Sequence, residues 1–175
     1  LAKEGRPGPV LVDIPKNIQI EQSEYEPKGL KSISRKTEDI NEKNLKEAIE
    51  MINKAERPFI LMGGGVVISE ASEEFSIFAG KVHAPVTSSL MGLGGFDGNH
   101  EQFTGMLGMH GTKASNLGVQ KCDLLIVVGA RFSDRVVGNA QAFARNAKIL
   151  HIDIDPAEIN KNIKADHHII GDIKE

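Results

Sequence analysis

After residue 42, the pattern of hydrophobic and polar positions alternates between the spacing of an amphipathic helix and the continuous apolar run of a buried strand. Leu45, Ala48, Ile49 and Ile52 recur at helical spacing with charged residues between them, and predict an amphipathic helix. The continuous apolar run at 59–62 predicts a strand that is buried on both faces of a parallel sheet. A helix followed by such a strand is typical of an α/β domain.

The same alternation continues to the end of the chain. Helices are expected from Ser69, as the N-cap, to about residue 81, at 112–121, in a segment through Phe143 and from Asp155-Pro156, and strands at 84–87, 124–128, 149–154 and 168–170. Alternating helices and strands imply parallel strands joined by right-handed crossovers. The predicted fold class is therefore α/β, a doubly wound, mostly parallel sheet with helices on both faces, of the Rossmann-like kind.

The first 41 residues have a different pattern. RPGPVLVDIP at 6–15 places a β-branched run between prolines and predicts a single strand without a helix of its own. Residues 19–41 are polar and have no sustained period, so they predict a linker, with 1–18 before it and the main domain at 42–175. The opening Leu-Ala-Lys-Glu-Gly, with no secretory leader, suggests that the chain is cut from a longer polypeptide.

Composition narrows the class of protein. A formal net charge of −3 gives no broad basic footprint for nucleic acid or anionic membrane, so we expect neither as a partner. No apolar run approaches the roughly 20 residues of a membrane span. The single Cys122 excludes an internal disulfide, and its place in QKCDLLIVV predicts a small, inert core residue.

The loops that follow the predicted strands hold the candidate chemistry, because ligands of open α/β sheets bind beyond the carboxyl ends of the strands. These loops are Gly63-Gly64-Gly65, 88–92, 129–135, 153–156 and Gly171-Asp172. Glycines at a strand-to-helix turn let a phosphate approach main-chain N–H groups, which suits a nucleotide. The dinucleotide fingerprint nevertheless fails, because Ile68 stands at its third glycine. A tight turn required only by packing remains the alternative.

Two arginines and one carboxylate extend this hypothesis. Arg131 and Arg135 stand four apart after a buried strand and could clamp a pyrophosphate with bidentate hydrogen bonds. Their alternative role is salt bridging to Asp134 or Asp123. Asp153, near the end of its strand, is placed to accept hydrogen bonds from ribose hydroxyls.

The histidines also suit packing roles. His151, Asp153 and Asp155 alternate on one strand, but a strand buried on both sides disfavours a metal site, and His167-His168 suits a surface or packing pair. His110, with glycines on both sides, could lie along a flat cofactor. The chain has no phosphate loop with Gly-Lys-[Ser/Thr], no nucleophile elbow and no metal-binding cysteine pair, so we predict a binding domain without catalytic or metal residues.

Long segments of the chain resemble one family. GRPGPVLVDIPKNIQ at 5–19, PVTSSLMGLGGFDGNH at 85–100, LGMHGTKASNLGVQKCDLLIVVGARFSDRVVGN at 107–139 and HIDIDPAEINKN at 151–162 are similar to the acetolactate (acetohydroxyacid) synthase large subunit, a thiamine-diphosphate enzyme. The resemblance implies that 1–18 is the last strand of a pyrimidine-binding domain and that 42–175 is a central domain that binds extended FAD.

The same resemblance implies a set of FAD contacts, all in the GRPGPV segment or in the loops beside the strand ends. They are Arg6, Gly63, Gly64, Gly65, Ser89, Leu90, Gly108, Met109, His110, Gly111, Gly129, Arg131, Arg135, Val136, Asp153, Ile154, Gly171 and Asp172. Asp153 and Ile154 would hold the adenosine part. Ser133 and Val137 depart from the usual RFDDR and RVTGN, which puts a local contact in doubt.

The complete enzyme of this family joins two 2-keto acids, pyruvate with pyruvate or 2-ketobutyrate, on thiamine diphosphate and magnesium in branched-chain amino acid biosynthesis, and FAD takes no part in the net reaction. The resemblance implies a cytoplasmic homodimer or tetramer with a small regulatory subunit, and a fragment without activity of its own. Alternatives are a sister carboligase or oxidase, a scaffolding module with an empty nucleotide pocket, and an NAD-dependent enzyme.

Overall fold

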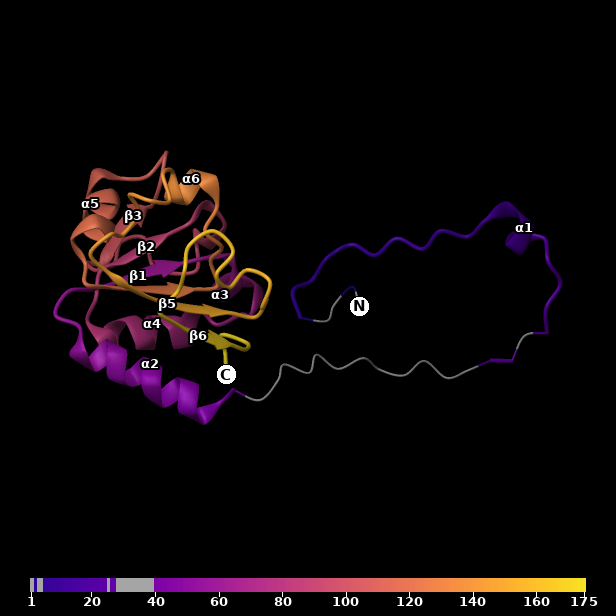
Figure 1. Ribbon diagram of the computed structural model, residues 1–175, viewed down its shortest axis with the longest axis horizontal. Coiled ribbons are helices and arrows are strands. Elements are labelled where there is room, and N and C mark those ends of the chain that lie inside the picture. Colours follow the sequence, from indigo (N-terminus) through magenta and orange to yellow (C-terminus); the bar gives the residue numbers. More distant parts are fainter. Residues whose placement is uncertain (1, 3–4, 25, 28–39) are drawn as a thin grey trace. The chain divides into compact units, whose positions relative to one another are not determined.

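The computed structural model describes residues 2, 5–24, 26–27 and 40–175 (Figure 1). Contacts divide the chain into two units, Leu1–Lys36 and Thr37–Glu175. Much of the predicted linker, at 28–39, lies outside the described residues. The predicted boundaries after residues 18 and 41 therefore stay predictions.

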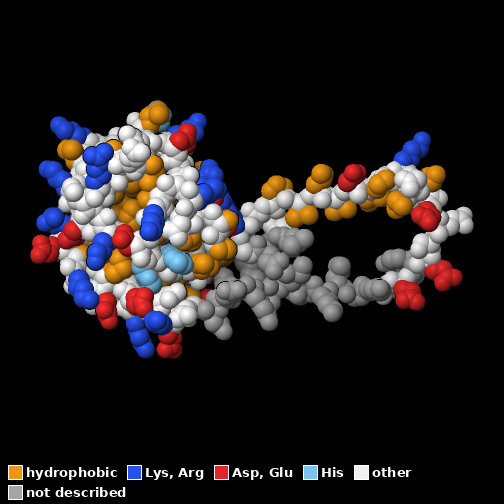
Figure 2. All heavy atoms as spheres, in the orientation of Figure 1, with side chains coloured by type: hydrophobic (Ala, Val, Ile, Leu, Met, Phe, Trp, Pro, Cys, Tyr) orange, Lys and Arg blue, Asp and Glu red, His pale blue; other side chains and the backbone are white. Residues whose placement is uncertain are grey.

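The first unit contains no strand among its described residues. Residues 7–15 are irregular, and α1 (Lys16–Gln19) adds one helical turn that was not predicted. Figure 2 shows the apolar side chains of this segment uncovered, and the side chain of Leu11 is 91% exposed. The predicted strand at 6–15 is thus absent here, because a lone extended segment has no neighbouring strand to take its main-chain hydrogen bonds.

The second unit is built on one sheet of six parallel strands, which confirms the predicted fold class. The strands are β1 (Pro58–Met62), β2 (Val86–Ser88), β3 (Phe103–Met106), β4 (Leu124–Val128), β5 (Lys148–Asp153) and β6 (His167–Ile170). Their order in the sheet is β3-β2-β1-β4-β5-β6. The order reverses between β1 and β4, and this switch point is where a doubly wound sheet opens a crevice for ligands.

Helices cover both faces of the sheet (Figure 1). One core cluster joins Ile60 and Met62 of β1 to α2 (Glu42–Lys54) and α4 (Ser72–Val82). The other joins Phe59 and Leu61 of the same strand to α5 (Lys113–Lys121). Alternate side chains of β1 point to opposite faces, so its continuous apolar run is explained by burial on both sides.

Helix α2 packs on the sheet along a narrower stripe than expected. Ala48 is buried, and Ile52 is partly buried against the same cluster. Leu45 and Ile49 are instead 43% and 48% exposed. The small side chain of Ala48 lets the helix approach the sheet closely, which leaves the larger neighbours at the flanks. The predicted apolar face was therefore correct only at its centre.

The helix predicted from Ser69 to about residue 81 begins three residues later, and a separate short helix precedes it. α3 (Gly64–Ile68) ends at Ser69, whose Oγ donates a 2.7 Å hydrogen bond back to the carbonyl oxygen of Gly65. α4 begins only at Ser72. Ser69 thus closes one helix and does not cap the next, which corrects the prediction.

Strand β3 was missed, as was the short 3-10 helix η1 (Leu90–Gly92), because both lie within the glycine-rich stretch at 92–111 or next to it. β3 is an edge strand that includes Gly105 at φ +95, and its pairing with β2 is irregular. Glycine in a short edge strand hides the usual β pattern.

The segments after β4 and β5 are less helical than predicted. α6 (Asp134–Val137) is a single turn that ends at Gly138, where φ is +61, and no helix continues through Phe143. After β5, Asp155 starts turns and not a helix: its Oδ1 accepts from the N–H of Ala157 at 3.0 Å. The Asp-Pro pair therefore begins a turn only.

Candidate functional site

Two glycine-containing loops meet directly at the switch point. The N–H of Gly63 donates to the carbonyl oxygen of Val128 at 2.9 Å, and the N–H of Gly65 donates to that of Gly129 at 3.0 Å. A Cβ atom on Gly63 would collide with the carbonyl oxygen of Gly129. Packing thus explains these glycines, and the N–H groups of Gly63 and Gly65 serve contacts within the protein.

The loop after β2 joins the same assembly. The N–H of Ser89 donates to the carbonyl oxygen of Met62 at 2.8 Å. A Cβ atom on Gly64 would lie 3.0 Å from the Cβ of Met91, and one on Gly92 would lie 2.7 Å from the carbonyl oxygen of Met62. The predicted contacts at Ser89 and Leu90 therefore lie beside the Gly63-Gly64-Gly65 turn.

The loop after β3 is fastened to the loop after β4. The N–H of Met109 donates to the carbonyl oxygen of Arg135 at 2.9 Å. Gly108 has φ +100, and its Cβ would lie 2.8 Å from the Cα of Val136. Only a glycine allows this approach, which brings the exposed Met109 and His110 next to α6.

The ends of β5 and β6 complete the row. Asp153 is buried, and its Oδ1 accepts from the N–H of Asp155 at 2.9 Å. Its carbonyl oxygen accepts from the N–H of Gly171 at 3.1 Å, and the N–H of Gly129 donates to the carbonyl oxygen of Ile152 at 2.8 Å. Direct main-chain contacts therefore link all five predicted loops at the carboxyl edge of the sheet.

The two arginines have different surroundings. Arg135 Nη1 lies 3.1 Å from Asp134 Oδ1, and both side chains are exposed, so the pair is worth about 0–1 kcal/mol and an anion could redirect the guanidinium. Asp123 is occupied elsewhere, by the N–H groups of Glu56 and Arg57. Of the two alternative salt bridges, the one to Asp134 forms with Arg135. Arg131 is exposed.

His151 is fully buried and has a packing role. Its Nε2 lies 3.0 Å from the carbonyl oxygen of Ala130, and its ring packs edge-on to Phe132. Burial lowers the pKa of His151, although the nearby Asp153 carboxylate opposes this shift. The ring is therefore neutral near pH 7, and its Nδ1 has no hydrogen-bond partner in the part of the chain that the structure describes.

The other candidate side chains for metal or thiol chemistry are accounted for by packing. His167 Nε2 lies 2.8 Å from the carbonyl oxygen of Asn44, which ties β6 to α2. Burial raises the pKa of the Cys122 thiol to about 11, which leaves almost no thiolate near neutrality. Among the described residues, no group of three His, Cys, Asp or Glu side chains is arranged to hold a metal ion.

One predicted contact lies apart from these loops, and one exposed residue within them was not predicted. Arg6 lies in the first unit, so its cofactor role stays a prediction. The sequence interpretation missed Met91, which is 74% exposed like Met109 and lies against Gly64. Its signal was an apolar side chain directly after Ser89-Leu90 in a strand-end loop. Such exposed apolar groups often mark a binding surface.

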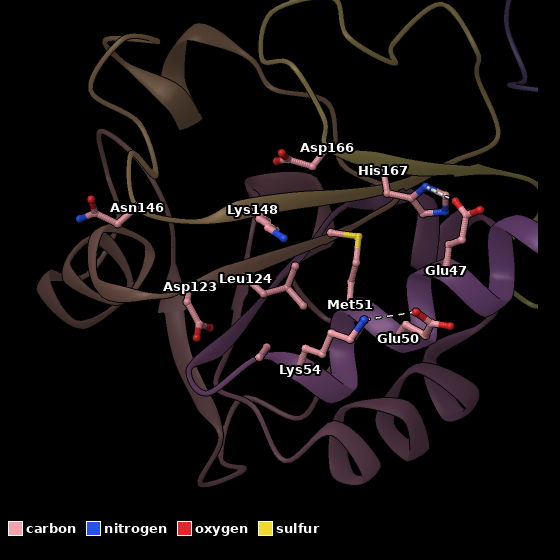
Figure 3. Close-up of a pocket in the computed structure, with 11 residues that line it drawn as sticks. Glu47, Glu50, Met51, Lys54, Asp123, Leu124, Asn146, Lys148, Asp166 and His167 are labelled. Atoms are coloured by element: carbon pink, nitrogen blue, oxygen red, sulfur yellow. Dashed lines mark hydrogen bonds and ion pairs between the residues drawn. The ribbon is translucent and has the colours of Figure 1, made fainter.

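A hollow of about 550 Å³ lies at the opposite edge of the sheet, between α2 and the amino ends of β4, β5 and β6 (Figure 3). Met51 and Leu124 give it apolar lining, and Lys54 and Lys148 are among its charged residues. None of the predicted cofactor contacts lines it. The carboxyl-edge loops therefore remain the candidate site.

Residues 45–175 match the family described as "Thiamine pyrophosphate enzyme, central domain". The chain belongs to this central-domain family. It is also 49% identical over 179 residues to the "Probable acetolactate synthase large subunit" of Methanocaldococcus jannaschii, which covers 99% of this chain and 30% of that protein. The "Acetolactate synthase isozyme 2 large subunit" of Escherichia coli is 44% identical, over 99% of this chain and 31% of that protein.

A solved structure from Mycobacterium smegmatis, described as a "putative thiamin diphosphate-dependent enzyme", has the same fold as this central domain. The TM-score is 0.72 at 26% identity, and the match covers 85% of this chain and 29% of that one. The chain thus spans about 30% of the length of the relatives that it matches. No helix of its described part has the length and apolarity that crossing a bilayer requires.

Proposed function

We propose that this chain is the FAD-binding central domain of an acetolactate synthase large subunit. The observation that carries the proposal is the row of six strand-end loops, the five predicted ones and the loop after β3, joined by main-chain contacts from Gly108 to Gly171 along the carboxyl edge of the sheet. An extended dinucleotide needs a continuous row of this kind. The names of the relatives, at 44–49% identity over nearly the whole chain, supply the family context.

The chemistry of the residues along this edge fits FAD. The exposed side chains of Leu90, Met91 and Met109 suit a flat, largely apolar ring system. The exposed guanidinium of Arg131 suits a pyrophosphate, because it offers paired N–H donors. The carboxylate of Asp153, at the end of β5, suits the hydroxyls of a ribose.

The contacts within the protein indicate which groups remain available to bind the phosphates of FAD. The N–H groups of Gly63 and Gly65 are engaged with the β4 side of the switch point, so the phosphates depend on other donors, of which Arg131 is the strongest. Arg135 could also bind the phosphates, but its guanidinium would first have to break its exposed ion pair with Asp134. The glycine turn then serves mainly to hold the loops in register. The flavin, when bound, would help to hold these loops together and would take no part in the net reaction.

In the complete enzyme, we propose, two 2-keto acids condense on thiamine diphosphate and magnesium held by other domains, in branched-chain amino acid biosynthesis. The expected assembly is a cytoplasmic homodimer or tetramer with a small regulatory subunit. The isolated chain would have no activity of its own. Formation of acetolactate from pyruvate, thiamine diphosphate and Mg²⁺ by this 175-residue chain would contradict that part of the proposal.

The binding proposal is tested by titrating the purified chain with FAD and following flavin fluorescence. Saturable quenching is expected, and Arg131→Ala should weaken it by roughly tenfold to a hundredfold, the value of a hydrogen bond to a charged group. Arg145→Ala is the matched control: Arg145 precedes β5, at the opposite edge, and should leave the titration unchanged.

A scaffolding module with an empty nucleotide pocket is the second candidate. It is favoured by the engagement of Gly63 and Gly65 in loop packing, which explains the glycine turn without a ligand. In that case no saturable quenching would occur at any FAD concentration while the chain remains folded by circular dichroism. This result would also reject the FAD proposal.

A further inference from the structure

The loop 107–111 follows β3 and is fixed by main-chain hydrogen bonds at both ends. The N–H of Leu107 donates to the carbonyl oxygen of Ser88 at 2.9 Å, and the N–H of Thr112 donates to that of Met106 at 2.9 Å. Its exposed tip carries Met109 and His110. Apart from the hydrogen bond from Met109 to Arg135, the tip depends on how Gly108 is held.

Gly108 is clasped by one side chain, the amide of Asn116 on α5. Oδ1 of Asn116 accepts from the N–H of Gly108 at 3.2 Å, and Nδ2 donates to the carbonyl oxygen of the same residue at 3.1 Å. The same Nδ2 also lies 3.1 Å from the carbonyl oxygen of Thr112. The amide thus pairs with Gly108 as a neighbouring strand would, through one donor and one acceptor.

Only a carboxamide can make this pair of contacts from this position. A carboxylate would place a second oxygen against the carbonyl oxygens of Gly108 and Thr112. An alkyl side chain would leave the N–H of Gly108 without its partner, although the carbonyl oxygen of Gly108 would keep its 2.9 Å hydrogen bond from the N–H of Gly111. Gly108 needs such support because its φ is +100 and because it fits tightly against Arg135. Without the clasp, the tip would sample other conformations.

The clasp acts on one end of the site. β3 and β5 are four strand spacings apart in the sheet order, about 19 Å at the usual spacing. Asp153, at the end of β5, is held by separate contacts with Asp155 and Gly171. A long ligand that spans the edge would therefore meet the clasped tip with one half and Asp153 with the other.

We propose that Asn116 is a positioning residue that fixes the Met109–His110 tip against Arg135, and so sets the affinity of the site for the flavin half of FAD and not for its adenine half. This inference rests on the proposed function. Asn116 acts through Gly108.

The test compares FAD and ADP as ligands of the purified 175-residue chain. Asn116→Ala should raise the dissociation constant of FAD about tenfold and change that of ADP less than about twofold, since ADP lacks the flavin. The near-ultraviolet circular dichroism of bound FAD should change as well, because the tip beside the ring is loosened. Gln120→Ala, an exposed amide on the same helix, is the matched control and should change none of these.

A second variant keeps the inference testable if Asn116→Ala does not fold. Asn116→Asp, which is nearly the same size, should raise the dissociation constant of FAD about tenfold at about pH 7 and change that of ADP less than about twofold, because the ionised carboxylate still accepts from the N–H of Gly108 but sets a second oxygen against its carbonyl oxygen. Equal weakening of FAD and ADP, or no weakening of either, would overturn the inference. If the unaltered chain binds no FAD, the proposed function itself fails.

Discussion

A Cβ atom on Gly65 would lie 2.7 Å from the Cα of Gly129, the residue whose carbonyl oxygen accepts the Gly65 N–H at 3.0 Å. The two residues come from loops that are more than sixty positions apart in the sequence. Their contact closes the first turn after β1 onto the turn after β4. Main-chain atoms are in direct contact here, so no side chain can move aside to make room.

This contact predicts a large penalty for Gly65→Ala. The added methyl group must push the two loops apart, and we expect a loss of about 2–4 kcal/mol in the free energy of unfolding, the range of overpacked and strained sites. Urea denaturation followed by circular dichroism measures it. Gly80→Ala is the control: Gly80 lies inside α4 with open space around it, so the change should stabilise the chain by about 0.5–1 kcal/mol. Equal effects of both variants would contradict the role of the contact.

The thiol of Cys122 should be chemically inert in the folded chain. Its thiol is buried, donates to the carbonyl oxygen of Val119 at 3.2 Å, and has a pKa raised to about 11 by burial. Labelling by a thiol-specific disulfide reagent at neutral pH should therefore be slower than in the urea-unfolded chain by about a hundredfold or more, since thiolate fraction and access both fall. Similar labelling rates in the two states would show that the residue is not in the core.

His151 predicts that the chain loses stability in mild acid. Burial lowers the pKa of its imidazole in the folded state, so the unfolded chain takes up a proton first, near the ordinary value of about 6.5. The free energy of unfolding should then fall as the pH falls through about 6.5. His151→Gln keeps a donor for the carbonyl oxygen of Ala130 but does not titrate, so its stability should change less between about pH 7.5 and 5.5.

The control for this pH profile is an exposed histidine. His83 lies outside the core at the end of α4, with φ +53, a conformation that asparagine tolerates well. His83→Asn should retain the pH profile of the unaltered chain. An unchanged profile in His151→Gln would exclude His151 as the source of the acid sensitivity.

The fold was predictable from the sequence where burial on both faces leaves an unbroken apolar run. β4 was expected at 124–128 and found at Leu124–Val128 for this reason. β3 could not be predicted, because a short edge strand with Gly105 has neither the run nor the alternation. The prediction of a strand at 6–15 failed for the opposite reason. The β pattern of this segment is clear, but a strand needs neighbouring strands, which the described part of the chain does not provide.

The candidate site was predictable as a set of loops and less so as a set of roles. The rule that loops after parallel strands share one edge brought Gly129, Asp153 and Gly171 together correctly. The sequence could not show that the N–H groups of Gly63 and Gly65 face another loop, because that depends on how β1 and β4 pair. It also gave no sign that Asn116, in the middle of a helix, reaches back to the main chain of Gly108.

Asp123 joins the start of β4 to the chain entering β1. Its Oδ2 accepts from the N–H of Glu56 at 2.8 Å, and its Oδ1 accepts from the N–H of Arg57 at 2.9 Å. Burial raises the pKa of the Asp123 carboxyl, but the two N–H donors and the Arg57 guanidinium outweigh it and hold the pKa below its usual value. The stabilisation is therefore present above about pH 4 and is lost as the pH falls through the lowered pKa.

Asp123→Ala should cost about 1–3 kcal/mol in the free energy of unfolding at neutral pH, because two main-chain donors lose a charged acceptor. Asp123→Asn is the matched control: one oxygen remains for one N–H, while the amide nitrogen repels the other, so its cost should be intermediate. Urea denaturation of the three chains at about pH 7 and about pH 3 measures both effects, and the difference between Asp123→Asn and the unaltered chain should shrink at the lower pH. A constant difference across this range would mean that the charge of Asp123 does not contribute, and that the link from β1 to β4 depends on the shape of the side chain alone.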